Sequence, residues 1–461
     1  MHVINEIITA DIELHIKEKQ YNQTAEFLAT CHPAEAAEII EEFEAEDAYA
    51  ILKEMDAQSA ADIFCRLPIA LQAETAELLE TKELTELLET LPPDDRADLA
   101  KSIPEQKLEE VLPFLAKKER DEIKKLAAYP EESSGSIMTT DYIAFPETLT
   151  VQQAINRIRL EGAQKESISL VFVVEKNRVL SGYATLESLI LAKPNALLKE
   201  IKKPVIAAVT ADSDREEASY TITKYGLIVL PVVDKAGILI GIITHDDAME
   251  VVEAERTEDM ERFMAIAGKH KDTTYLKTSV VSEFSRRIPW LVILALFSTF
   301  SGIVLQSYES TISSLMLLTF YMPMLTDMGG NTGSQSATVV VRALALKEIE
   351  ASDIFRVIWK ELRVALMLAV ILGGIAMLRI SLTGGEVFIP ETLTLFRIGC
   401  AISLALSAQV VSATIIGALL PLVCALFKFD PALVASPALT TIVDITGLVI
   451  YFGVTKALLH L

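Results

Sequence analysis

An apolar final third is the feature that most restricts the fold of this chain. After Arg286 and Arg287 the 461-residue sequence turns hydrophobic, in five stretches separated by short polar segments. A helix needs about 20 apolar residues to cross a hydrocarbon core of about 30 Å, and each stretch is long enough. We predict five membrane-spanning helices at about 288–306, 312–340, 357–380, 393–427 and 434–459. The second and fourth are longer than needed, so they are expected to tilt or break.

We expect a multi-pass protein of the cell (plasma) membrane. Basic residues near the span ends predict its orientation. One set of ends carries Arg286, Arg287, Arg342, Lys347, Arg356, Lys360, Arg363 and Lys428, and the opposite set carries Arg379, Arg397 and Lys456. Cytosolic ends are enriched in Lys and Arg, so we expect the N-terminus in the cytosol and the C-terminus outside. The cysteines form no CxxC pair and are predicted to be free thiols, as in a reducing cytosol. They are Cys31, Cys65, Cys400 and Cys424.

The charge of the chain is concentrated in its front part. The net charge is −23, of which −17 lies in residues 1–130 and none in residues 287–461. An acidic front argues against nucleic acid, because a phosphate backbone would be repelled. It suits a cation ligand, or serves only solubility. We find no pairing of a nucleophile with a base in the sequence, so we expect that the protein is not an enzyme.

Residues 1–130 are predicted to form an acidic, all-helical cytosolic domain. They are rich in Ala, Leu and Glu, and the first glycine of the chain is Gly135. A weak repeat, with Leu, Pro or Ala, Ala and an acid at the same spacing, begins at Leu28, Leu52 and Leu88. Short helices joined at such turns would stack into a superhelix. The structural interpretation of Asp94 and Asp95, which follow two prolines, is capping of a helix N-terminus.

Residues 131–250 contain a duplicated pattern. Residues 171–190 align without gaps on residues 230–249, an offset of 59, and each copy reads strand, turn, strand, then a threonine that opens a helix. This α/β repeat resembles a tandem pair of CBS domains, at 131–200 and 201–250, which bind regulatory ligands and are not catalytic. In that resemblance Thr244 and Asp247 match the pattern that holds a ribose, which implies ATP as a ligand. A long connecting helix is expected at 251–285, before the transmembrane domain at 286–461.

The second span contains a polar run that would be costly against lipid. Such residues are tolerable where they face other helices or a water-filled cavity. Asn331 and Gln335 lie four residues apart on one helix face, which favours a pore-lining role for them and for Gly329 and Gly330. The alternative is close helix packing through small residues.

Asp444 lies near the middle of the fifth span among apolar neighbours. An ionised carboxylate there costs about 2.5–3.5 kcal/mol on insertion scales. Either it is protonated and hydrogen-bonded to a nearby threonine, or it belongs to a cation site or a proton relay. Mg²⁺ gives up its waters reluctantly and is often held by one or two carboxylates. A homodimer would bring two copies of Asp444 together around a hydrated ion.

Two membrane segments resemble the MgtE family of magnesium channels: GGNTGSQSAT at 329–338, and the stretch from Asp430-Pro431 to Asp444-Ile445-Thr446-Gly447. The domain order resembles it too. The resemblance implies a homodimer with a pore between the second and fifth spans, Asp444 holding hydrated Mg²⁺, and Mg²⁺ as both substrate and regulator. It also implies cytosolic Mg²⁺ sensor sites. Carried over by position, the sensor residues are Asp94, Asp95, Asp214, Glu216, Asp246, Asp247, Glu250, Glu255, Glu258, Asp259 and Asp430.

The chain departs from the family pattern at two places and leaves two other functions open. Gly226 replaces an expected acid, and Thr326-Asp327 replaces small or apolar residues. One alternative is transport of another divalent cation such as Mn²⁺ or Co²⁺, although the polar runs of the second and fifth spans contain no His or Cys, which softer ions favour. The other is a non-conducting membrane sensor that reads nucleotides through the CBS pair, which would leave Asp444 unexplained.

Overall fold

The computed structural model describes residues 12, 14–162, 165–268, 278–383, 389, 393–431 and 437–461. It divides into two compact units: the first contains the described residues up to Glu255, and the second those from Arg256 onward. The predicted multi-domain fold is confirmed, with a helical domain and a CBS pair in the first unit and a bundle of long helices in the second.

The front of the first unit is a stack of short helices, as predicted. Prolines and acidic residues set their starts: Pro93 begins α8, and the Asp56 carboxylate accepts a hydrogen bond from the Ser59 amide at the start of α5 (3.0 Å). Each helix buries one face in a common apolar core. The helices are α2 Tyr21–Leu28, α3 Pro33–Ile40, α4 Ala45–Lys53, α5 Ala57–Phe64, α6 Ile69–Leu78, α7 Thr81–Thr90, α8 Pro93–Ser102, α9 Glu105–Val111 and α10 Lys117–Leu126.

Two three-stranded sheets follow, and they repeat the 59-residue offset of the sequence. In each, a parallel first strand and an antiparallel third strand flank the second, and the register shifts at Val173/Val174 and again at Val232/Val233. Val179 forms a bridge with its own equivalent, Ile238, which is the mark of a pseudo-two-fold axis between the modules. The elements are β1 Ala144–Pro146, α11 Val151–Glu161, β2 Leu170–Val174, β3 Leu180–Thr185, α12 Leu186–Leu191, α13 Leu198–Ile201, β4 Val209–Thr210, α14 Arg215–Tyr225, β5 Val229–Val233 and β6 Leu239–Thr244.

The helical domain packs on the second CBS module within the first unit. Ala97 of α8 and Leu126 of α10 are fully buried in the same apolar core as Ile222 and Leu230. At the edge of this contact Lys118 forms an ion pair with Asp141, at 3.5 Å. The acidic first turn of α8 therefore lies beside the CBS pair.

The second unit contains the end of α15 His245–Phe263 and the membrane helices. These are α16 Val280–Ser307, α17 Glu309–Ser314, α18 Met322–Ala345, α19 Ile354–Thr383, α20 Leu395–Leu426 and α21 Pro437–Leu459. Among the described residues, four helices are long and apolar enough to cross a membrane: α16, α19 with the turn before it, α20 and α21. The 24-residue α18 is long enough but carries the polar run.

The structure refines the prediction at three places. The second span does not begin at 312, because the chain turns at Leu315 and forms a short 3₁₀ helix, Met316–Tyr321, before α18. The fourth span does not break: α20 is one 32-residue helix despite Pro421. The connecting helix ends at Phe263, and α16 already begins at Val280 rather than at 286.

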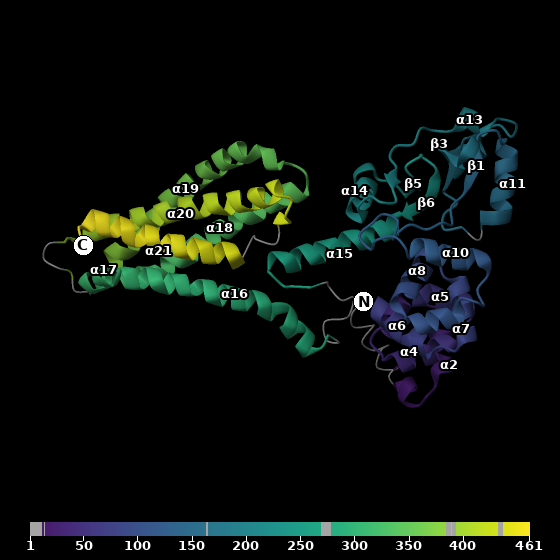
Figure 1. The fold of residues 1–461 in the computed structure, drawn as a ribbon, viewed down its shortest axis with the longest axis horizontal. Coiled ribbons are helices and arrows are strands. Elements are labelled where there is room, and N and C mark those ends of the chain that lie inside the picture. Colours follow the sequence, from purple (N-terminus) through teal and green to yellow (C-terminus); the bar gives the residue numbers. More distant parts are fainter. Residues whose placement is uncertain are drawn as a thin grey trace. The chain divides into compact units, whose positions relative to one another are not determined.

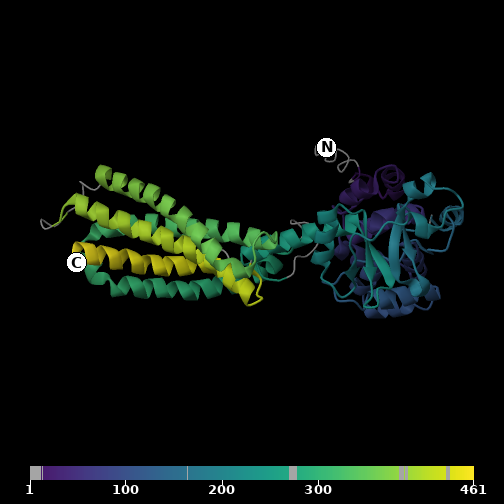
Figure 2. The ribbon, with the colours of Figure 1, turned by 90° about the horizontal axis from the view of Figure 1, so that it is seen from above.

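Glycines allow α18, α20 and α21 to pack closely, and Figures 1 and 2 show these helices side by side. A methyl group at Gly417 of α20 would overlap the carbonyl oxygen of Gly333 of α18. At Gly374 of α19 a methyl group would meet nothing within 4 Å. Gly417 is therefore a true helix-crossing point.

We expect Gly417→Ala to destabilise the membrane unit by about 1–3 kcal/mol, because the backbones must move apart. The matched control Gly374→Ala should leave the midpoint of thermal unfolding in lipid nearly unchanged. Equal midpoints for the two variants would contradict this packing.

Candidate functional site

One face of α18 is polar and is not covered by the described part of this chain. Asp327, Asn331, Gln335 and Thr338 are all exposed, and their spacing of four, four and three residues places them on one stripe of the helix. The Asn331 amide donates to the Asp327 carboxylate at 3.2 Å, so the Asp327 departure pairs with a residue of the family motif. Asn331 and Gln335, which were predicted to line a pore, thus lie on an open, polar helix face. We call the four side chains of this face, Asp327, Asn331, Gln335 and Thr338, the α18 stripe.

The two glycines of α18 that were predicted to line a pore lie outside the α18 stripe. Gly329 and Gly330 are buried. A methyl group at Gly330 would lie 3.4 Å from Thr440 of α21, and one at Gly329 would lie 3.1 Å from Val443. These two glycines lie in helix contacts within the described chain, which is the position that the small-residue alternative expected.

Asp444 lies on α21 one turn after Thr440, which contacts Gly330. Its side chain is half-buried, and within the described residues it has no hydrogen bond or ion pair. The hydroxyls of Thr441 and Thr446 donate to backbone carbonyls of their own helix, at 3.1 Å to Pro437 and 2.9 Å to Ile442. Because each hydroxyl has one proton, these two threonines do not stabilise Asp444, which weakens the hydrogen-bonded alternative.

Two buried polar residues of the helix bundle were not predicted from the sequence. Gln409 of α20 is fully buried and donates from Nε2 to the Val443 carbonyl at 2.9 Å. Glu361 of α19 is 7% exposed and accepts a hydrogen bond from the Ser336 hydroxyl at 2.9 Å. The polarity that marked Asp444 could have found Gln409, which lies inside the fourth predicted span. Glu361 lies between Lys360 and Arg363 near the start of its span, so its burial could not be predicted from the sequence.

In the first unit, the predicted sensor residues Asp94, Asp95 and Asp247 are brought together where α8 meets the CBS pair. Helix α8 begins at Pro93 with Pro92 as its N-cap, so the two acids lie inside the first turn and the capping interpretation is wrong. One Asp94 carboxylate oxygen is completely covered and has no hydrogen-bond partner among the residues that the structure describes.

Burial and like charge shift the titration of this cluster. Burial raises the pKa of Asp95 to about 8, and the charges of Asp247 and Glu250 act in the same direction. Burial also raises the pKa of Asp94 well above its usual range, helped by Asp247 and Asp95. For Asp247, burial raises the pKa and the charge of Asp246 adds to it, although the Thr244 hydroxyl opposes the shift. These carboxylates destabilise one another when ionised, which a bound cation would relieve.

The cluster is not a closed metal cage. Within the described residues, no three His, Cys, Asp or Glu side chains are placed to hold a metal ion together. Asp246 and Glu250 are exposed and contribute charge at its edge.

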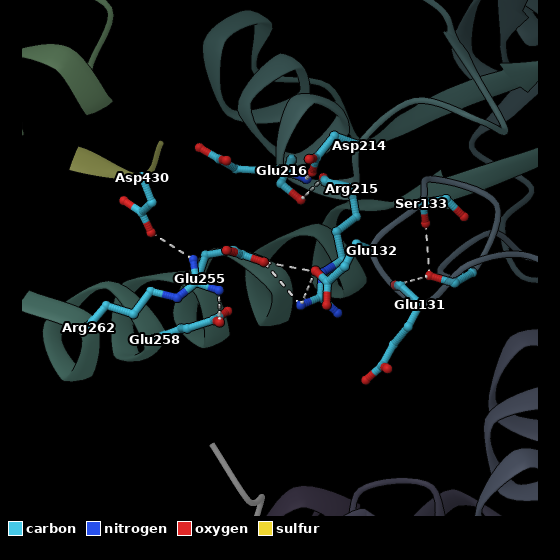
Figure 3. A network of polar contacts seen from close by, with 12 residues as sticks. Glu131, Glu132, Ser133, Asp214, Arg215, Glu216, Glu255, Glu258, Arg262 and Asp430 are labelled. Atoms are coloured by element: carbon cyan, nitrogen blue, oxygen red, sulfur yellow. Dashed lines mark hydrogen bonds and ion pairs between the residues drawn. The ribbon is translucent and has the colours of Figure 1, made fainter. Parts of the chain in front are cut away.

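Two arginines neutralise other predicted sensor residues (Figure 3). Arg215 forms ion pairs with Glu255 and Glu132, each at 3.0 Å. In the second unit, Arg262 forms ion pairs with Glu258 and, at 2.9 Å, with Asp430, which precedes α21. Neither arginine was predicted from the sequence as a partner of these acids. The signal for Arg262 was its position four residues after Glu258, which is the spacing of a helical ion pair.

The remaining predicted sensor residues lie at the surface. Asp214 is the N-cap of α14 and accepts from the Glu216 amide at 2.8 Å, while Glu216 and Asp259 have exposed side chains. Gly226 ends α14 with a φ of +60°, a left-handed conformation that glycine adopts without strain. The departure at this position therefore has a backbone reason.

The nucleotide candidates Thr244 and Asp247 are neighbours. The buried Thr244 hydroxyl donates to the Asp247 carboxylate. Asp247 thus belongs to two predictions: it is a candidate contact for the ribose of a nucleotide and a member of the acidic cluster.

Comparisons with known proteins cover nearly all of these features. The family model described as a divalent cation transporter matches residues 322–454, the MgtE intracellular N domain matches 31–132, and the CBS domain matches 135–195 and 198–254. The chain is 32% identical to the magnesium transporter MgtE of Thermus thermophilus over 460 residues, which is 99% of this chain and 100% of that protein. It is 30% identical to the magnesium transporter MgtE of Bacillus subtilis, over 80% of this chain and 78% of that protein.

Solved structures are similar as well. The cytosolic domain of the Mg²⁺ channel MgtE in complex with ATP matches with a TM-score of 0.50 and 30% identity, over 53% of this chain and 99% of that one.

Proposed function

Because the chain belongs to the MgtE family of magnesium transporters, which are not enzymes, we propose that it is a Mg²⁺-selective channel of the cell membrane that cytosolic Mg²⁺ closes. The observation that carries the pore is the uncovered α18 stripe beside a helix with an intramembrane carboxylate, Asp444. The multi-pass character follows from the family and its apolar helices. The proposed orientation has the N-terminus in the cytosol and the C-terminus outside.

A homodimer explains the polar stripe. Four exposed polar side chains on one membrane helix would be costly against hydrocarbon, where their hydrogen-bonding groups have no partners. A second copy, related by a two-fold axis, would present the same stripe to the first and enclose a hydrated path. Asp444 would occur twice along that path.

Hydrated Mg²⁺ suits such a path. The ion keeps several waters while one or two carboxylates hold it, so two Asp444 groups and the amides of Asn331 and Gln335 supply the right chemistry. Mn²⁺ and Co²⁺ bind more readily to nitrogen and sulfur ligands, which the stripe lacks.

Closure is proposed to come from the acidic cluster of the first unit. Asp94, Asp95 and Asp247 repel one another when ionised, so a divalent cation bound among them would favour packing of the helical domain on the CBS pair. Loss of the cation would loosen that contact, and the change would reach the membrane through α15. This is a two-state element biased by ligand charge.

ATP is proposed as a second regulatory ligand of the CBS pair. The support is the pairing of Thr244 with Asp247 and the similarity to a channel domain crystallised with ATP. If ATP uses Asp247, its binding and that of a cation at the acidic cluster should influence each other.

Ion uptake into proteoliposomes tests the function. We expect Mg²⁺ entry well above that of protein-free vesicles, with Mn²⁺ and Co²⁺ slower and Ca²⁺ slowest. Uptake of Mn²⁺ or Co²⁺ without Mg²⁺ would favour the other divalent transporter. Absence of flux for all four ions, in vesicles that retain folded protein and are free of regulatory Mg²⁺, would favour the non-conducting sensor.

A further inference from the structure

Gln409 joins the two helices that carry the proposed ion path. It lies on α20, outside both membrane motifs, and its side chain is fully buried between α18 and α21. Its Nε2 donates to the carbonyl oxygen of Val443, the residue directly before Asp444. The amide therefore holds the backbone of α21 at the point from which Asp444 extends.

Both neighbouring helices have glycine where Gln409 enters. A methyl group at Gly329 of α18 would lie 2.5 Å from Nε2, and one at Gly447 of α21 would overlap the same atom. Any larger residue at either position would push Gln409 away from Val443. The side chain thus sets how closely α18 and α21 approach and how they are rotated.

Stability alone does not explain a glutamine at this place. Its Oε1 is buried and has no hydrogen-bond partner within the described structure. A buried acceptor without a partner costs free energy, and an apolar residue of the same size would avoid that cost. A buried oxygen without a partner calls for an explanation, and the bond that the same amide makes directly before Asp444 points to a role in placing that residue.

We propose that Gln409 is a positioning residue of the ion path, which fixes Asp444 of α21 relative to the α18 stripe. The inference rests on the proposed pore function and adds a residue outside its motifs. It predicts that the amide matters for ion selection and ion affinity more than for folding.

The main test is Gln409→Met, which keeps the volume and removes the hydrogen bond. We expect the midpoint of thermal unfolding to stay the same or rise, while the Mg²⁺ concentration for half-maximal uptake rises about two- to tenfold, the range of one lost hydrogen bond. Discrimination between Mg²⁺ and Ca²⁺ should fall with it. The matched control is Thr414→Val on the same helix. Within the described residues, the buried Thr414 hydroxyl donates only to the Val410 carbonyl, one turn earlier in α20. This control should change neither uptake property.

A second pair of variants separates positioning from space filling. Gly447→Ala should disturb folding, and adding Gln409→Ala should restore it by removing the overlap. If the double variant recovers folding but keeps the altered half-maximal concentration, the amide is needed. Recovery of both properties, or unchanged uptake in Gln409→Met, would overturn the proposal. Failure of the pore assignment itself would appear separately, as normal uptake in Asp444→Asn.

Discussion

Asp444→Asn is expected to reduce Mg²⁺ uptake into proteoliposomes by at least about tenfold, since losing a charged partner in a partly buried site costs about 1.5–3 kcal/mol. The variant keeps the size of the side chain and removes its charge. Asp444 has no ion pair or hydrogen bond within the described residues, so the substitution removes no polar contact among them. In a homodimer each substitution would remove two charges from one ion path.

Folding and flux must be measured together for this variant. The midpoint of thermal unfolding in lipid should stay the same or rise slightly, because an intramembrane charge has been removed. Glu348→Gln, a neutral substitution at an exposed residue between α18 and α19, is the matched control and should conduct normally. Unaltered flux and ion selectivity in Asp444→Asn would remove the pore assignment.

Without Mg²⁺, the contact between the helical domain and the CBS pair is expected to weaken as the pH rises toward 8. Burial and the charges of Asp247 and Glu250 raise the pKa of Asp95 to about 8 in the packed form. In the separated form this pKa returns toward its usual value near 4. Between about pH 4 and pH 8, the Asp95 carboxyl is therefore protonated in the packed form and ionised in the separated form. The contact is strongest below about pH 4 and loses up to about tenfold in its equilibrium constant per pH unit until about pH 8.

Saturating Mg²⁺ should abolish most of this pH dependence, because the cation replaces the proton as the partner of the carboxylates. Limited proteolysis of the full-length protein in lipid, from pH 5 to pH 9 with and without Mg²⁺, measures both effects. Asp95→Asn should flatten the pH response and reduce protection by Mg²⁺. Asp121→Asn, an exposed acid on α10 of the same domain, controls for the protease and for net charge. A contact that tightens with rising pH, or a slope that survives in Asp95→Asn, would contradict the assignment.

The parts that could be predicted from sequence are those governed by one repeated local pattern. The offset of 59 residues predicted two equivalent modules, and the structure has the same strand order and register shift in both. Apolar length likewise predicted the four apolar membrane helices. These signals depend on neighbouring residues, so they can be read without knowing tertiary contacts.

Side chains that act across helices could not be assigned in the same way. Gly329 and Asn331 are two residues apart, yet one lies in a helix contact and the other on the open stripe. Sequence spacing describes the angle between them but not which partner helix covers which face. Gln409 lies 34 residues from Val443 along the chain, so its bond depends on how α20 and α21 pack.

The arginine partners of three predicted sensor residues could not be found from the sequence, and the reason is electrostatic. Glu255 and Glu258 are acidic in a strongly acidic segment, which suggested an open cation site. Arg215 reaches Glu255 from a different element, and Arg262 reaches Asp430 from 168 positions earlier in the chain. A count of local charge does not include such partners.

The ion pairs of Arg262 can also be described as a concentration effect. A guanidinium carried by the chain is present near Glu258 and Asp430 at an effective concentration set by its tether, on the order of millimolar or more, whatever the medium contains. A free Mg²⁺ ion must compete with this attached cation, which cannot be diluted. Under the proposed function, these two carboxylates would contribute little to the Mg²⁺ threshold. The response would then depend mainly on the acidic cluster at α8.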